Sequence, residues 1–210
     1  MRSADQIPIG LADNNLAPAY VDLSDTHFLV VGSYRSGRST ALETLVLGLS
    51  ALAPAPRLWL LSPRRSPLRE LDVWEHAATA TDTCTQLIAI LADESQTQEP
   101  DAPHLFVFID DGGELADPLV SSKLERIVRT GRDGGFTVVA SVETSSARGI
   151  AIPWIREIRK DGHGLLLQPD LLSDGDLLGT RLPRRVAVPM VPGRGFIVTR
   201  GVAELVQVAS

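Results

Sequence analysis

The sequence contains a single cysteine, Cys84, which excludes an internal disulfide bond. It is also poor in histidine, and the four that it has are scattered along the chain, at His27, His76, His104 and His163. No group of cysteines and histidines therefore has the spacing of a metal site. We expect Cys84 to be a residue of the protein core.

Long apolar runs are absent as well. None approaches the roughly 18 residues needed to cross a bilayer, and residues 1–6 lack the apolar segment of a signal peptide. The net charge of −6 argues against a protein whose whole surface binds nucleic acid, although a local basic patch is compatible with it. We find no internal repeat and no low-complexity tail. These absences predict a soluble, cytoplasmic domain.

The most informative feature that is present is a loop bounded by two glycines. It follows the apolar residues 28–31 and precedes the helix-like residues 41–49. In the pattern G-x-x-x-x-G-K-[ST], glycines let the backbone curl so that successive N–H groups and a helix N-terminus converge on phosphate. A simple glycine-rich turn is the alternative. We predict that the loop binds ATP through Gly32, Ser33, Tyr34, Arg35, Ser36, Gly37, Arg38, Ser39 and Thr40.

One position of this loop departs from the pattern, because Arg38 stands where lysine is expected. A planar guanidinium keeps the positive charge but fits poorly where a compact ammonium group must reach the β- and γ-phosphate oxygens. Ser39 remains available to place its hydroxyl on Mg²⁺. We expect nucleotide binding to survive the substitution and hydrolysis to be slow or absent.

Apolar runs of strand length alternate with helical patterns, which predicts a mostly parallel α/β sheet flanked by helices. We expect the strand at 57–61 to lie beside the strand at 28–31, and the uninterrupted apolar run at 105–109 to be a central strand. A short edge strand is expected at 19–23. The remaining predicted elements are strands at 136–141 and 165–167, helices at 83–94 and 121–129, and a C-terminal hairpin of 195–198 with 203–208.

Two carboxylates, Asp110 and Asp111, directly follow the apolar run at 105–109. A strand that ends in carboxylates can hold Mg²⁺ and orient an attacking water. We assign the metal-side role to Asp110 and the water-positioning role to Asp111, with an ordinary acidic turn as the alternative. Glu143, at the end of the next strand, is expected near the terminal phosphate, which its charge would repel.

Three arginines are candidates for a cation that acts at the site of a neighbouring subunit: Arg129, Arg132 and Arg148. Ring-forming ATPases stabilise transition-state charge in this way. For each arginine individually, a solvated or helix-end charge is the alternative.

With these motifs in place, the chain resembles the FtsK/SpoIIIE family of RecA-like ATPases, and most of all the C-terminal ATPase domains of EccC-type type VII secretion proteins. The resemblance implies a RecA-like P-loop fold that binds ATP and Mg²⁺, in a parent chain with several such domains. It also implies a homo-hexameric, membrane-attached machine that receives secreted proteins or their signal peptides. Later domains of such proteins are often degenerate, and Arg38 is similar to that condition. The resemblance is carried by residues 7–11, 20–23, 32–40, 109–111, 131–132 and 192–195.

Three functions remain open on the sequence alone. The first is a nucleotide-binding, weakly hydrolysing domain that regulates or docks substrates of a secretion motor. The second is a DNA-translocating motor domain, in which phosphate contacts come from Arg64, Arg65, Arg184 and Arg185. The third is an interaction module that has lost nucleotide binding.

An apolar content of 44% is enough to fill a sizeable core, and we predict one domain over residues 1–210. Within it, residues 1–25 form a lead-in, residues 26–163 form the nucleotide-binding core, and residues 164–210 form C-terminal strands.

Overall fold

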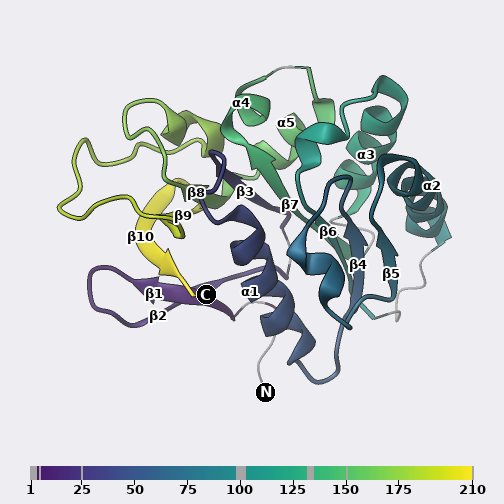
Figure 1. Ribbon diagram of the computed structural model, residues 1–210, viewed down its shortest axis with the longest axis horizontal. Coiled ribbons are helices and arrows are strands. Elements are labelled where there is room, and N and C mark those ends of the chain that lie inside the picture. The colour runs from purple at the N-terminus through teal and green to yellow at the C-terminus, as the bar shows by residue number, and fades with distance from the viewer. Residues whose placement is uncertain are drawn as a thin grey trace.

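The protein is built around a 10-stranded sheet with the strand order β2-β1-β10-β9-β8-β3-β7-β6-β4-β5 (Figure 1). The computed structural model describes residues 4, 6–24, 26–97, 103–131, 135–149 and 151–209. The strands are β1 (Ile7–Ala12), β2 (Pro18–Val21), β3 (Phe28–Gly32), β4 (Arg57–Leu61), β5 (His76–Ala78), β6 (Leu105–Ile109), β7 (Phe136–Glu143), β8 (His163–Leu167), β9 (Arg194–Thr199) and β10 (Val202–Val208).

The helices connect and cover these strands. The α-helices are α1 (Arg38–Ser50), α2 (Thr81–Thr97), α3 (Pro118–Gly131), α4 (Thr144–Arg148) and α5 (Pro153–Arg159). Short 3₁₀ helices follow β4, β6 and β8, and these are η1 (Pro67–Glu70), η2 (Gly112–Glu114) and η3 (Asp174–Leu178). In the part of the chain that the structure describes, no helix is both long enough and apolar enough to span a bilayer.

The sheet has a parallel half and an antiparallel half. Strands β8, β3, β7, β6, β4 and β5 pair in parallel, whereas β9, β10, β1 and β2 continue the sheet with antiparallel pairs. The carboxyl ends of parallel strands share one edge, which is where open α/β sheets bind ligands. The loops after β3, β4, β6 and β7 therefore meet at one place.

Two apolar cores hold the helices against the two faces of the sheet. Successive residues of β3 alternate between them, with Leu29 in one core and Val30 in the other, as the two-residue period of a strand requires. Helix α1 packs on the face of Val30, which is the side of the sheet toward the viewer in Figure 1. Helices α2, α3 and α5 pack on the face of Leu29. Because both faces are covered, the central strands are apolar throughout.

The predicted α/β architecture and the C-terminal hairpin are confirmed, but the expected position of β4 is wrong. β4 pairs with β6 and β5, while β3 lies between β8 and β7. The later strands β7 and β6 lie between β3 and β4 in the sheet. After β4 the chain crosses over, and it returns to β3 only through β7, which pairs with it in parallel. β8, which spans the predicted boundary at residue 164, also pairs in parallel with β3.

Two smaller features differ in how well the sequence indicated them. Cys84 is fully buried, as expected, and burial raises the pKa of its thiol to about 11.

Strand β1 was not predicted, because Pro8 and Gly10 are typical of turns rather than strands. A side chain at Gly10 would collide with the carbonyl oxygen of Gln207 in the neighbouring strand β10. Glycine therefore permits the close pairing of β1 with β10.

The turn before β9 packs directly against the glycine-bounded loop. Gly193 N–H donates a hydrogen bond to Ser36 O (2.8 Å), and Gly37 has a positive φ of 99°. A Cβ atom at Gly37 would lie 2.9 Å from Gly193 N. Both the backbone conformation and the lack of space therefore require glycine at position 37.

We expect Gly37→Ala to lower the free energy of unfolding by about 3 kcal/mol, because it combines a strained φ with a collision. Gly179→Ala is the matched control, since Gly179 also has a positive φ (64°) but a Cβ there meets nothing within 4 Å. The control should cost only about 1 kcal/mol. Urea unfolding of both variants measures the difference, and equal costs would show that the packing against Gly193 is unimportant.

Candidate functional site

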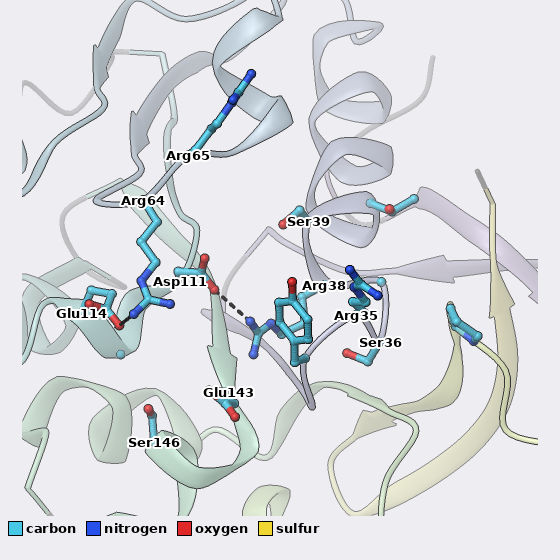
Figure 2. A pocket seen from close by; sticks show the side chains of 15 residues that line it. Arg35, Ser36, Arg38, Ser39, Arg64, Arg65, Asp111, Glu114, Glu143 and Ser146 are labelled. Atoms are coloured by element: carbon cyan, nitrogen blue, oxygen red, sulfur yellow. Dashed lines mark hydrogen bonds and ion pairs between the residues drawn. The ribbon is translucent and has the colours of Figure 1, made fainter.

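A cavity of about 470 Å³ opens at the carboxyl ends of the parallel strands (Figure 2). The loop between β3 and α1, together with the first turn of α1, forms one wall. The loops that follow β4, β6 and β7 contribute the opposite side. The lining residues are Tyr34, Arg35, Ser36, Gly37, Arg38, Ser39, Thr40, Arg64, Arg65, Asp111, Gly113, Glu114, Glu143, Ser146 and Pro192.

The loop of the glycine motif has the curled backbone that the pattern predicts. Arg35 adopts a left-handed conformation (φ 60°), and so does Gly37, which is the N-cap of α1. Left-handed residues next to ordinary ones turn successive N–H groups toward a common point, which makes an anion-binding concavity. The first N–H groups of α1 have no partner within the helix and add to it. The buried hydroxyl of Ser36 has no hydrogen-bond partner among the described residues.

Asp110 is buried behind the cavity lining: it is 1% exposed and accepts hydrogen bonds from three serine hydroxyls, one of which belongs to Ser39, a residue that lines the cavity. Ser141 Oγ donates to Oδ1 (2.6 Å), while Ser39 Oγ (2.9 Å) and Ser66 Oγ (2.7 Å) donate to Oδ2. The three serines come from β7, the first turn of α1 and the loop after β4. These bonds satisfy the buried carboxylate without a cation.

The arrangement around Asp110 fits a magnesium ion. Mg²⁺ in phosphate-transfer sites usually takes one or two protein oxygens, several waters and phosphate oxygens of the substrate. Ser39 already places its hydroxyl beside a carboxylate oxygen of Asp110. Among the described residues, no group of three or more His, Cys, Asp or Glu side chains forms a metal site of its own. The ion would therefore enter together with the nucleotide phosphates.

The Arg38 guanidinium is held by two acceptors at the mouth of the loop. Nη1 donates to Gly32 O (2.9 Å) and Nη2 donates to Asp111 Oδ1 (2.8 Å), and the side chain is only 12% exposed. Figure 2 shows the ion pair with Asp111 as a dashed line across the cavity. The substituted lysine position and the second carboxylate are therefore engaged with each other.

The charged form of Asp111 is electrostatically disfavoured at this position. Burial raises the pKa of its carboxyl group, the neighbouring Asp110 raises it further, and Arg38 and Arg64 oppose the rise. The residue also has a left-handed backbone (φ 53°), and its N–H donates to Ser141 Oγ (3.0 Å). The strand end therefore directs Asp111 into the cavity beside Arg38.

Charges of both signs line the cavity. The cations are Arg35, Arg38, Arg64 and Arg65, and the anions are Asp111, Glu114 and Glu143. Glu143 is the last residue of β7 and pairs with Gly32 of β3, which places it at the start of the loop, while its expected position near the terminal phosphate stays a prediction. A phosphate chain in this cavity would therefore meet carboxylates as well as cations.

The sequence analysis missed Ser66, Ser141 and Glu114 as site residues. Ser141 was included only as the last residue of the predicted strand at 136–141, and Ser66 and Glu114 were not singled out. The signal that would have found them is their place in the sequence: Ser66 and Glu114 lie in the segments that follow β4 and β6, and Ser141 lies near the carboxyl end of β7, where parallel strands open onto a ligand.

Two of the three arginines proposed to act on a neighbouring subunit make contacts within this chain. Arg129 pairs with Glu125 (2.8 Å) and Glu157 (3.5 Å), and Arg148 pairs with Asp174. Arg132 lies outside the described residues. A role on a neighbouring subunit stays a prediction for all three.

The arginines considered for DNA phosphates do not line one cavity. Arg64 and Arg65 line the cavity described above, whereas Arg184 lines a different one, formed by the segment 171–184.

Replacing Arg38 should raise the pKa of Asp111 further, because the opposing positive charge is removed. A carboxyl group whose pKa is raised in the folded state contributes fully to stability at pH values below its unfolded pKa of about 3.8. This contribution to stability is lost as pH rises through the pKa of the folded state. We expect this loss to occur at higher pH in Arg38→Gln than in the unchanged protein. Carboxyl-carbon NMR titration of Asp111 measures the shift directly.

The matched control for this titration is Arg35→Gln. Arg35 is on the same loop, but its guanidinium lies over the Tyr34 ring, 5.2 Å from the ring centre. This variant should leave the pKa of Asp111 nearly unchanged. Equal shifts in the two variants would contradict a specific Arg38–Asp111 interaction.

Comparisons with known proteins agree with this geometry. The chain is 27% identical to the ESX secretion system protein EccC of Thermomonospora curvata, over 94% of this chain and 16% of the relative. It is 28% identical to the ESX-4 secretion system protein EccC4 of Mycobacterium tuberculosis, over 97% of this chain and 18% of the relative. The chain thus spans less than a fifth of the length of these curated relatives. No protein-family model matches it.

Solved structures give the same result for the fold. The cytoplasmic domain of the Thermomonospora curvata type VII secretion ATPase EccC matches with a TM-score of 0.80 and 25% identity, over 99% of this chain and 26% of that one. ATPases 2 and 3 of the same EccC, in complex with a signal sequence peptide, match with a TM-score of 0.78 and 25% identity, over 99% of this chain and 41% of that one. The chain is therefore a homologue of the EccC proteins of ESX secretion systems and has the FtsK/SpoIIIE-like P-loop fold of their ATPase domains.

Proposed function

We propose that the chain is an ATP-binding domain of an EccC-type type VII secretion ATPase, which hydrolyses ATP slowly or not at all and regulates or docks secreted proteins. One observation carries the proposal. In a phosphate-binding loop that otherwise matches its pattern, the guanidinium of Arg38 bridges Gly32 O and Asp111. The loop keeps its backbone cradle and Ser39, which favours binding of nucleotide.

The same ion pair disfavours hydrolysis. An attacking water must be oriented by a carboxylate, and Asp111 is engaged with Arg38 instead. Asp111 also has a shorter side chain than the glutamate that is common at this place. The proposed binding residues are those of the loop from Gly32 to Thr40.

Mg²⁺ is the cofactor that this site fits, with the Ser39 hydroxyl and Asp110 as its protein ligands. The ion would neutralise charge on the β- and γ-phosphates when it is bound. Asp110 and Ser39 would hold the ion, and the backbone N–H groups of the loop would bind the phosphates.

The proposed partners follow from the relatives. The EccC structure in complex with a signal sequence peptide supports other ATPase domains of the same parent chain, and the signal peptides of secreted proteins, as partners. We propose that the parent chain acts in the cytoplasm as a homo-hexamer attached to the membrane, and that this chain is one of its degenerate C-terminal domains.

Isothermal titration with Mg·ATP, together with a phosphate-release assay, tests the proposal. We expect saturable binding at micromolar concentration, which corresponds to about −8 kcal/mol, with no measurable phosphate release. Asp110→Asn should bind ATP equally well with and without Mg²⁺, because the metal-side ligand is lost. Absence of binding in the unchanged protein would favour the interaction module, and rapid turnover without partners would contradict the slow site.

Arg38→Lys should restore part of the missing chemistry, because a lysine ammonium can reach the phosphates without spanning from Gly32 O to Asp111. We expect an increase of about tenfold in ATP affinity or in the rate of hydrolysis. The control is Arg35→Lys, which makes the same chemical change at an exposed position of the loop. If Arg38→Lys changes neither quantity, the arginine is not what limits the site.

A further inference from the structure

The loop after β4 brings a second arginine to the nucleotide cavity from the side opposite Arg38. We propose that Arg64 binds the terminal phosphate of the nucleotide in cis and supplies the charge that Arg38 does not deliver. This inference rests on the proposed ATP-binding function and names the residue that would distinguish triphosphate from diphosphate at that site.

Arg38 is poorly placed for the terminal phosphate. Two of its nitrogens are engaged with Gly32 O and Asp111, and little of its surface reaches solvent. To contact phosphate, it would have to leave a half-buried carboxylate uncompensated. The cation of the altered pattern position is therefore not freely available.

Arg64 has the opposite properties. Its side chain is 64% exposed and pairs with Glu114 (2.7 Å), which is itself 43% exposed. An ion pair this exposed stabilises the protein very little, so exchanging Glu114 for a phosphate group is easy. Phosphate also accepts two parallel hydrogen bonds from a guanidinium, which makes it the stronger partner.

The position of Arg64 matches the far end of a phosphate chain. In Figure 2, Asp111 lies between Arg38 and Arg64, and the Arg64 guanidinium points down toward Glu114 at the rim. Arg64 is close enough to Asp111 to counteract the rise in the pKa of that carboxyl, which burial and Asp110 cause. Arg64 therefore lines the same cavity as the loop, on the far side of Asp111 from Arg38.

The loop that carries Arg64 is fixed to the predicted metal site. Ser66, two residues further along, is buried and donates its hydroxyl to Asp110 (2.7 Å). Ser62 Oγ donates to Arg64 O (2.8 Å), which holds the backbone of Arg64 itself. The base of Arg64 is therefore positioned relative to the carboxylate that would hold Mg²⁺, while its side chain stays free to move.

The carboxylates that line the cavity also favour a cation beside the terminal phosphate. Glu143, at the end of β7, and Glu114 both line the cavity, and each would repel a terminal phosphate. When Arg64 moves from Glu114 to phosphate, its positive charge offsets part of this repulsion.

The test compares Mg·ATP with Mg·ADP by isothermal titration of the unchanged protein and of Arg64→Ala. We expect Arg64→Ala to lower the affinity for Mg·ATP about tenfold and to change the affinity for Mg·ADP less than about twofold. Arg69→Ala is the matched control, because it removes the same charge from η1, the short helix that follows this loop, and Arg69, which donates to Thr79 O (3.4 Å), is not among the residues that line the cavity. It should leave the ratio of the two affinities unchanged.

Glu114→Gln provides a second, independent variant. It releases Arg64 from its present partner and removes a repelling charge, so it should raise the affinity for Mg·ATP more than that for Mg·ADP. An unchanged ATP-to-ADP ratio in both Arg64→Ala and Glu114→Gln would overturn the inference, and so would an equal loss for both nucleotides in Arg64→Ala. Failure of the unchanged protein to bind either nucleotide would instead overturn the proposed function.

Discussion

The geometry of the site depends on one buried carboxylate, that of Asp110. It accepts hydrogen bonds from Ser39, Ser66 and Ser141, which belong to three separate segments of the chain. A hydrogen bond to a charged group contributes about 1.5–3 kcal/mol, so these contacts hold the first turn of α1, the loop after β4 and strand β7 together. They place the phosphate-binding loop opposite the loop that carries Arg64.

The second determinant of the site is Arg38, which stands where the loop pattern has lysine. A guanidinium is long and planar enough to bond Gly32 O and Asp111 at once, and this removes both groups from the chemistry that they would perform separately. The backbone cradle does not depend on that side chain. For the proposed function, this means that nucleotide can still bind where hydrolysis is slow or absent.

The sequence predicted the central strands well because their signals are local, whereas the roles assigned to Asp110 and Asp111 stay predictions. An uninterrupted apolar run followed by Asp110 and Asp111 indicates a buried strand that opens onto a ligand. β1 escaped prediction because Pro8 and Gly10 obscure its pattern. The place of β4 was wrong because strand order is decided by crossovers between distant segments and leaves no local signal.

By itself, the sequence determined the class of fold, the loop from Gly32 to Thr40 and the loss of its lysine, because each of these lies within a few consecutive residues. Only the tertiary structure decided what those residues contact. The bonds that side chains make to the carboxylates of Asp110 and Asp111 join positions 31 to 73 residues apart, such as Ser141 with Asp110 and Arg38 with Asp111. The physical reason is that such pairs meet only after parallel strands align their carboxyl ends at one edge of the sheet.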